Sequence, residues 1–162
     1  EIYTLSLHDA LPISVVTAFA LGFDVATPVI TTVGAKPCAM GGTPEACVLG
    51  TRIVTTAVNA ALANGMLAHA DETDDSHAPS LCHPGCAIVP AALAMGERQA
   101  ASGAALLRAV ALGYDIGTRI NMSLNAYEFR EDGHSTHSFG PMFGAAAAAL
   151  VARKRFAKPQ AA

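Results

Sequence analysis

The chain lacks the features of several common protein classes. It contains no tryptophan, and only 14% of its 162 residues are charged and 6% aromatic. The net charge is −3, and the ten lysine and arginine residues are scattered apart from a single run at 153–155. Because nucleic-acid binding needs a basic stripe or patch, the sequence predicts no DNA or RNA partner.

Long hydrophobic runs are lacking too. The apolar stretches 11–23 and 138–152 are shorter than the roughly 18 apolar residues that indicate a transmembrane helix. The start of the chain has no basic segment of the kind that opens a secretory signal. We therefore expect a cytoplasmic protein without membrane association, in which all four cysteines are thiols: Cys38, Cys47, Cys82 and Cys86.

The composition that remains is typical of one ordered, mostly helical domain. Apolar residues make up 52% of the chain, which is long enough to bury a core of its own. The first fourteen residues, EIYTLSLHDALPIS, read unlike the rest and look like a translated sequencing adapter. We treat 1–14 as a non-native leader and 15–162 as the domain.

The pattern of apolar residues predicts an all-α fold. A short helix end is expected at 15–23, and a loop or short extended piece at 25–50, which is rich in glycine, proline and threonine. Ser102 is a candidate N-cap for a long helix whose apolar positions include Leu106 and Leu107. The main predicted helices are 51–70, 86–96, 103–124 and 143–155.

One window concentrates the titratable side chains. From His69 to Cys86 the chain reads HADETDDSHAPSLCHPGC, with three histidines and four carboxylates. A solvated acidic loop would not explain why histidines alternate with the acids. Acid–base and metal chemistry use these side chains because their pKa values can be brought near neutrality.

Two histidine clusters each precede a predicted helix. His83 is followed by Pro84, which disfavours the helical conformation at His83, and the free amides of the next helix start just beyond. The second cluster, GHSTHSFG, contains His134 and His137. We expect His83 and His134 to meet across one pocket, where two positive helix ends would suit a carboxylate substrate.

Metal binding is the rival interpretation of the same window. His77 and His83, with Asp74 or Asp75, could supply ligands, and two nearby cysteines could add soft ones. The spacing matches no established zinc pattern, and the cysteines lack the spacing of an iron–sulfur site. We therefore predict no metal and no cofactor. A metal-dependent hydrolase stays open as an alternative, as does a noncatalytic helical dimerisation module.

Several ordered motifs resemble the MmgE/PrpD family, which includes 2-methylcitrate dehydratase and cis-aconitate decarboxylase. They are NGMLAHADETDDSHAPSLCHPG, VPAALAMGE, GYDIGTRI and GHSTHSFGPMFGAAAAA, and the likeness runs over about 46–156. The resemblance implies a mostly helical catalytic domain, a lid domain further along the chain, a homodimer, and cofactor-free acid–base chemistry on di- or tricarboxylates. The chain would then be the N-terminal part of a lyase, inactive alone.

The resemblance also assigns site residues. It places the family's first acidic position, usually aspartate, at Glu72, and its threonine at Ser76. The predicted site residues are, for catalysis, His83, His134 and Glu72 and, for substrate binding, Asp75, Ser76 and His77.

Cationic partners for a polycarboxylate are missing from this region. The chain has no lysine or arginine between Glu72 and Glu97, although each substrate carboxylate favours a cation, preferably a bidentate arginine. Arg119 is an internal candidate, but its position is more typical of a surface or ion-paired arginine. We therefore expect the cations to come from elsewhere, and the resemblance to the MmgE/PrpD family implies that they lie beyond Ala162.

Overall fold

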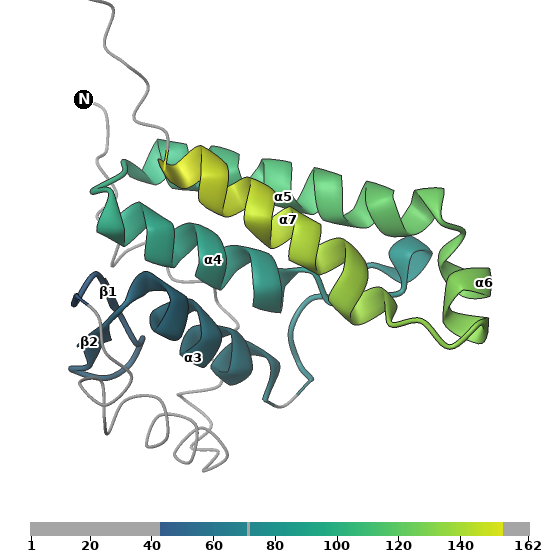
Figure 1. The fold of residues 1–162 in the computed structure, drawn as a ribbon, viewed down its shortest axis with the longest axis horizontal. Helices are drawn as coiled ribbons and strands as arrows, with labels where there is room; N and C mark the ends of the chain where they lie inside the picture. Colours follow the sequence, from purple (N-terminus) through teal and green to yellow (C-terminus); the bar gives the residue numbers. More distant parts are fainter. Residues whose placement is uncertain (1–42, 71, 154–162) are drawn as a thin grey trace, which may run out of the picture.

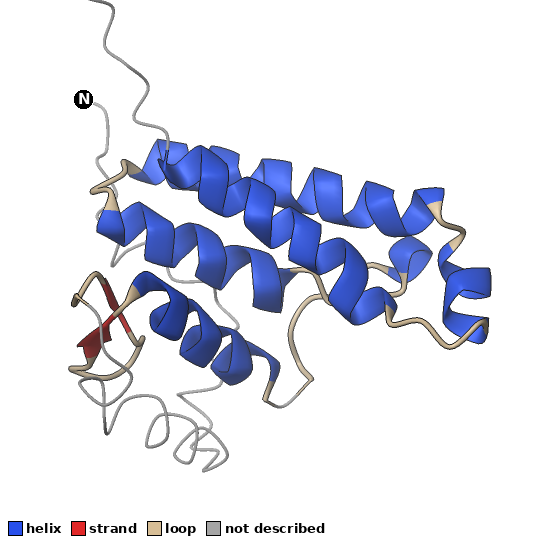
Figure 2. Cartoon of the chain, in the orientation of Figure 1, coloured by secondary structure: helices blue, strands red, loops and turns tan. Residues whose placement is uncertain are grey.

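A computed structural model describes residues 43–70 and 72–153. The predicted leader, the 15–23 segment and Cys38 lie outside these residues. Helices dominate the chain (Figure 2), so the predicted all-α class is confirmed. The elements are β1 (Ala46–Cys47), β2 (Val54–Thr55), α3 (Ala57–His69), the short 3-10 helix η2 (Ala78–Ser80), α4 (Gly85–Arg98), α5 (Gly103–Ser123), α6 (Ala126–Glu131) and α7 (Thr136–Arg153).

Four helices build the body of the domain. The two longest, α5 and α7, run side by side, α4 packs against both, and α3 packs on α4 (Figure 1). The antiparallel strands β1 and β2 form a small hairpin beside α3 and α4. Among the described residues, no helix is both long enough and apolar enough to cross a membrane.

The backbones of α5 and α7 touch through glycines. A Cβ atom added to Gly113 would lie 2.8 Å from the carbonyl oxygen of Gly144 and 2.5 Å from Cγ2 of Ile88. One turn along, Gly117 and Gly140 meet in the same way. Side chains at these positions would overfill a closely packed interface, so the glycines set the distance between the two helices.

The buried face of α5 differs from the predicted one. Leu106 is buried as expected, but Leu107 is 61% exposed. The residues that the helix buries are mostly small: Leu106, Ala109, Gly113, Gly117 and Asn121. The two adjacent leucines therefore lie on different sides of the helix, and small residues line the face toward α7 because α7 approaches too closely to admit large side chains.

The helix starts are explained by local chemistry. Ser102 caps α5 as predicted, with its Oγ accepting a hydrogen bond from Ala105 N at 3.3 Å, and Thr56 caps α3 in the same manner. The helix predicted from Phe143 begins earlier, at Thr136, and contains Pro141. The Gly140-Pro141 pair reads as a helix break in sequence, yet here it lies inside the helix.

Candidate active site

Two histidines approach one carboxylate oxygen of Asp74. His69 is the last residue of α3, Asp74 lies in the following loop, and His83 stands just before α4. Oδ1 of Asp74 accepts a hydrogen bond from Nδ1 of His69 at 3.1 Å and lies 3.4 Å from Nδ1 of His83. The end of one helix and the beginning of another thus meet at a single acid.

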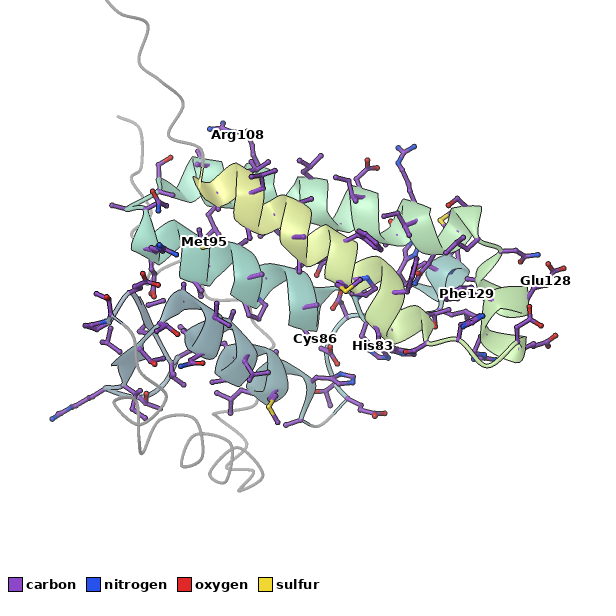
Figure 3. The ribbon with its side chains drawn as sticks, viewed as in Figure 1. His83, Cys86, Met95, Arg108, Glu128 and Phe129 are labelled. Atoms are coloured by element: carbon purple, nitrogen blue, oxygen red, sulfur yellow. The ribbon has the colours of Figure 1, made fainter. Side chains whose placement is uncertain are left out.

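A third imidazole comes from the other histidine cluster. His137, in the first turn of α7, stacks on His83 with ring centroids 5.2 Å apart and planes inclined by 23°. His69 approaches the same ring, with centroids 5.3 Å apart. In Figure 3, His83 and Cys86 lie at the N-terminal end of α4, beside the first turns of α7. The three rings form one group, which we call the imidazole cluster.

Asp74 is the buried member of this site. Its side chain is only 3% exposed, against 21% for His83. Among the described residues, neither Oδ2 of Asp74 nor Nδ1 of His83 has a hydrogen-bond partner. Buried polar atoms without partners are costly and rare, so these two atoms mark a place where a proton, water or ligand would be stabilised.

Asp75 stabilises the start of α4 through a hydrogen bond. Its Oδ1 accepts the backbone N–H of Gly85 at 2.9 Å. Burial, followed by the hydrogen bond to Asp75 and its charge, raises the pKa of Tyr114 well above its usual range. A Cβ atom on Gly85 would collide with the Asp75 carboxylate and the Tyr114 hydroxyl. Asp75 therefore helps to hold His83 in place, and its predicted contact with substrate stays a prediction.

Asn121 connects the two histidine clusters. It is fully buried on α5, and its Nδ2 donates to the carbonyl oxygens of Ser80 at 3.0 Å and Thr136 at 2.7 Å. The hydroxyl of Thr136 in turn donates to the carbonyl of Leu81 at 2.6 Å. These bonds fix the segment that leads to His83 against the start of α7, which carries His137.

The pKa of His137 is lowered. Burial is the largest cause, followed by the positive charge that His83 and His69 carry when protonated. The charge of Glu72 opposes this shift, and that of Arg130 adds to it. His137 is therefore mainly neutral near pH 7, and Glu72 and Arg130 both act electrostatically on the imidazole cluster.

The position of His134 differs from the prediction. Its ring stacks on Phe129 of α6, with centroids 4.6 Å apart, and the backbone N–H of His134 donates to the Phe129 carbonyl. The ring that stacks on His83 is His137 instead. The reason is the early start of α7: His137 lies within its first turn, whereas His134 precedes the helix. Whether His134 takes part in catalysis stays a prediction.

The remaining predicted residues lie in the loop before α4. Nδ1 of His77 is 2.8 Å from Oγ of Ser80, so this histidine bonds within its own loop. Ser76 and Glu72 are exposed. Arg119 is 75% exposed and pairs with Asp115 at 2.6 Å, the ion-paired arrangement considered from the sequence.

A cavity of about 140 Å³ lies beside Asp74 and Asp75. None of the three cluster histidines lines it, and its wall carries the carboxylates of Asp74 and Asp75 within a mostly apolar surface. A polycarboxylate would be repelled there, so an anionic substrate fits the imidazole side better. The lining residues are Leu49, Asn64, Ala68, Asp74, Asp75, Gly85, Cys86, Val89, Pro90, Leu93 and Tyr114.

The cysteines of the described residues are free thiols, as predicted. Burial, reinforced by Asp74, raises the pKa of Cys86 to about 12. Burial also raises the pKa of Cys82. Since the thiolate is the reactive form of cysteine, neither residue is prepared to act as a nucleophile near pH 7.

Some features of the site were not predicted from the sequence. Asp74 was named only as a possible metal ligand and His69 was given no role, and nothing in their spacing showed that they would touch. His137 belongs to the same motif as His134, and a helix start at Thr136 would have distinguished them. Asn121 had a usable signal, because a polar residue on the buried face of a long helix needs a buried partner.

The fold and the site together define a class: a mostly helical domain that carries clustered imidazoles and a buried carboxylate where helices begin. A family model described as the MmgE/PrpD N-terminal domain matches residues 16–154. The chain belongs to the MmgE/PrpD family. Searches of curated proteins and of solved structures found no match.

Proposed function

We propose that this chain supplies the acid–base groups of a lyase that acts on di- or tricarboxylates. The reaction would be elimination of water, as in 2-methylcitrate dehydratase, or decarboxylation. The observation that carries the proposal is the stacked pair of His83 and His137 beside the buried Asp74. Membership of the MmgE/PrpD family supports the reaction class.

The two imidazoles are suited to proton transfer. The lowered pKa of His137 leaves a neutral ring that can accept a proton. In elimination, one histidine takes the proton from the carbon next to a carboxylate, and that C–H electron pair becomes the new double bond. The hydroxyl group leaves as water once a second acid protonates it. In decarboxylation, the carbon that loses carbon dioxide takes up a proton instead.

The substrate needs positive charge near the imidazole cluster. Arg130 is the described cation whose charge acts on His137, and we propose that it attracts one substrate carboxylate. The three lysines, Lys36, Lys154 and Lys158, all lie outside the described residues. We propose that further cations come from outside these residues and that the active protein is a cytoplasmic homodimer.

We propose that the active protein continues past Ala162, and turnover by this longer product of the same reading frame, which we call the extended protein, tests the proposal. We expect loss of water or carbon dioxide from at least one of 2-methylcitrate, citrate and cis-aconitate. His83→Asn should lower kcat by about 10²- to 10⁴-fold, the usual value of one acid–base group. Asp132→Asn, on the exposed end of α6, is the control and should leave kcat unchanged. Equal activity of His83→Asn and the wild type would contradict the proposal.

A further inference from the structure

We propose that His69, Asp74 and His83 bind a divalent transition-metal ion of the Zn²⁺ type, and that the bound ion blocks proton transfer at His83. Each residue offers one ligand atom, which gives two imidazole nitrogens and one carboxylate oxygen. These three atoms lie within 4.8 Å of one another. Two histidines and a carboxylate are a common ligand set for such ions.

The spacing of the ligand atoms fits tetrahedral coordination. With metal–ligand bonds of about 2.0–2.1 Å, neighbouring ligands of a zinc ion lie about 3.3 Å apart. Oδ1 of Asp74 is 3.1 Å from Nδ1 of His69 and 3.4 Å from Nδ1 of His83. The side chain of His69 is 38% exposed. Its ring therefore has room to move, which would adjust the distance between the two imidazole nitrogens. Two of the three distances between ligand atoms therefore already match those around a zinc ion.

The unpartnered atoms point to a ligand independently of the spacing. Nδ1 of His83 is buried without a hydrogen-bond partner among the described residues, and so is Oδ2 of Asp74. The Asp74 side chain is only 3% exposed to solvent. Desolvation of a carboxylate is costly unless a cation compensates it. A divalent ion would supply that charge and give His83 Nδ1 a partner.

The three ligands leave one coordination position open. They come from the end of α3, the loop after it and the residue before α4, and Asp75 anchors the start of α4 through Gly85. Zinc sites with three protein ligands keep the fourth position for water or a substrate group. We therefore expect one ion per chain with one exchangeable ligand.

The inhibitory consequence rests on the proposed lyase function. A metal ion on Nδ1 of His83 occupies that lone pair, and the other ring nitrogen then carries the hydrogen of a neutral imidazole. Such a ring cannot accept a proton from substrate. Zn²⁺ would then act as an inhibitor, which chelation removes.

Cobalt absorption tests the site without reference to activity. The full 162-residue chain is freed of metal with EDTA, dialysed and titrated with Co²⁺. We expect the visible bands of four- or five-coordinate Co²⁺ at one ion per chain, displaced by Zn²⁺. His69→Ala should abolish these bands, and Asp74→Asn should weaken them. His77→Ala, a histidine of the same loop that bonds to Ser80, is the matched control and should retain them.

Any of three results would overturn the proposed metal site: an unchanged octahedral Co²⁺ spectrum, equal Co²⁺ binding by His69→Ala and the wild type, or loss of Co²⁺ binding in His77→Ala. A thiolate-to-cobalt band in the near ultraviolet would assign the ion to cysteines and equally overturn it. Far-ultraviolet circular dichroism verifies that His69→Ala is folded, and its partly exposed position favours this outcome.

Activity measurements test the inhibitory role separately. On the extended protein, saturating Zn²⁺ should lower kcat by roughly 10²-fold or more, the scale of one lost acid–base group, and EDTA should restore it. The same turnover with and without Zn²⁺, in a protein that shows the cobalt bands, overturns the inhibition. Absence of turnover with EDTA counts against the proposed function, whereas the cobalt bands alone decide the ion site.

Discussion

The rings of His83 and His137 are stacked, with centroids 5.2 Å apart, although α4, α5 and α6 separate them in sequence. Asn121 explains how they meet, because its side-chain amide donates to two carbonyl oxygens. One belongs to Ser80, three residues before His83, and the other to Thr136, at the start of α7. The geometry of the candidate site therefore depends on α5, which contributes no histidine to it.

The electrostatic environment of His137 predicts opposite effects from two neighbours. Arg130 lowers the pKa of His137 and Glu72 raises it. In chelator-treated protein, Arg130→Gln should therefore raise this pKa, and Glu72→Gln should lower it. Titration of the histidine side chains by NMR measures both. Shifts of the same sign in the two variants would contradict the electrostatic account.

The same shift predicts how acid affects stability. The pKa of His137 in the folded chain lies below its ordinary value of 6.5, so below neutrality the unfolded state binds more protons. The contribution of His137 to stability is complete above pH 6.5 and is lost as the pH falls through that value towards the folded pKa. Urea unfolding of wild type and His137→Asn, in EDTA, should show a steeper acid loss in the wild type. Parallel curves would show that His137 does not contribute.

Asn121 is expected to be essential for stability. Replacing it with leucine keeps a similar volume but removes the donor to the Ser80 and Thr136 carbonyls. We expect the free energy of unfolding to fall by about 1–3 kcal/mol, because a buried acceptor loses its partner. Met122→Leu, at a half-exposed neighbouring position, should stay within about 0.5 kcal/mol of the wild type. Chemical denaturation distinguishes the two, and equal stability would contradict this role.

The glycine contact between α5 and α7 predicts a clear cost for one methyl group. In an exposed helix Gly→Ala stabilises by about 1 kcal/mol, but at Gly113 the new Cβ would meet backbone 2.8 Å away on Gly144. Overpacking costs typically about 1–3 kcal/mol, so Gly113→Ala should be destabilising overall. Thermal unfolding measures this, with the exposed Ala111→Ser as control. A higher Tm for Gly113→Ala would show that the helices are not in contact there.

The thiols of the described residues should react slowly. Burial and Glu97 raise the pKa of Cys47 to about 12, and burial raises the pKa of Cys82 and Cys86. At pH 8 few of these groups are thiolates, so iodoacetamide should label them much faster after denaturation than before. Peptide mass spectrometry resolves each site. Rapid labelling of Cys82 in the folded protein would contradict its burial.

The starts of α4 and α5 were predictable because they depend on local chemistry, whereas the helix predicted from residue 51 begins at Ala57, after the strand Val54–Thr55. The cap at Ser102 and the turn at Pro84-Gly85 located the starts of α5 and α4 to within a residue. The start of α7 was misplaced because the Gly140-Pro141 pair, which breaks many helices, is here accommodated by close packing against α5.

The site was predictable in composition but not in pairing. The titratable window supplies His69, Asp74 and His83, and the GHSTHSFG motif supplies His137, whose ring stacks on His83. Which histidine stacks on His83 depends on how the first turn of α7 is oriented. The contacts of Asn121 and Thr136, which are distant in sequence, set this orientation. Such long-range bonds leave no periodic signal in sequence, so His137 was not distinguished from His134.

A double-mutant cycle tests the central claim, that His83 and His137 transfer protons as a pair. In the extended protein, kcat is measured for wild type, His83→Asn, His137→Asn and the double variant. We predict losses of about 10²- to 10⁴-fold in each single variant and little further loss in the double variant, because groups that act as a unit are not additive. Full activity of His137→Asn, or losses that multiply in the double variant, would contradict the account.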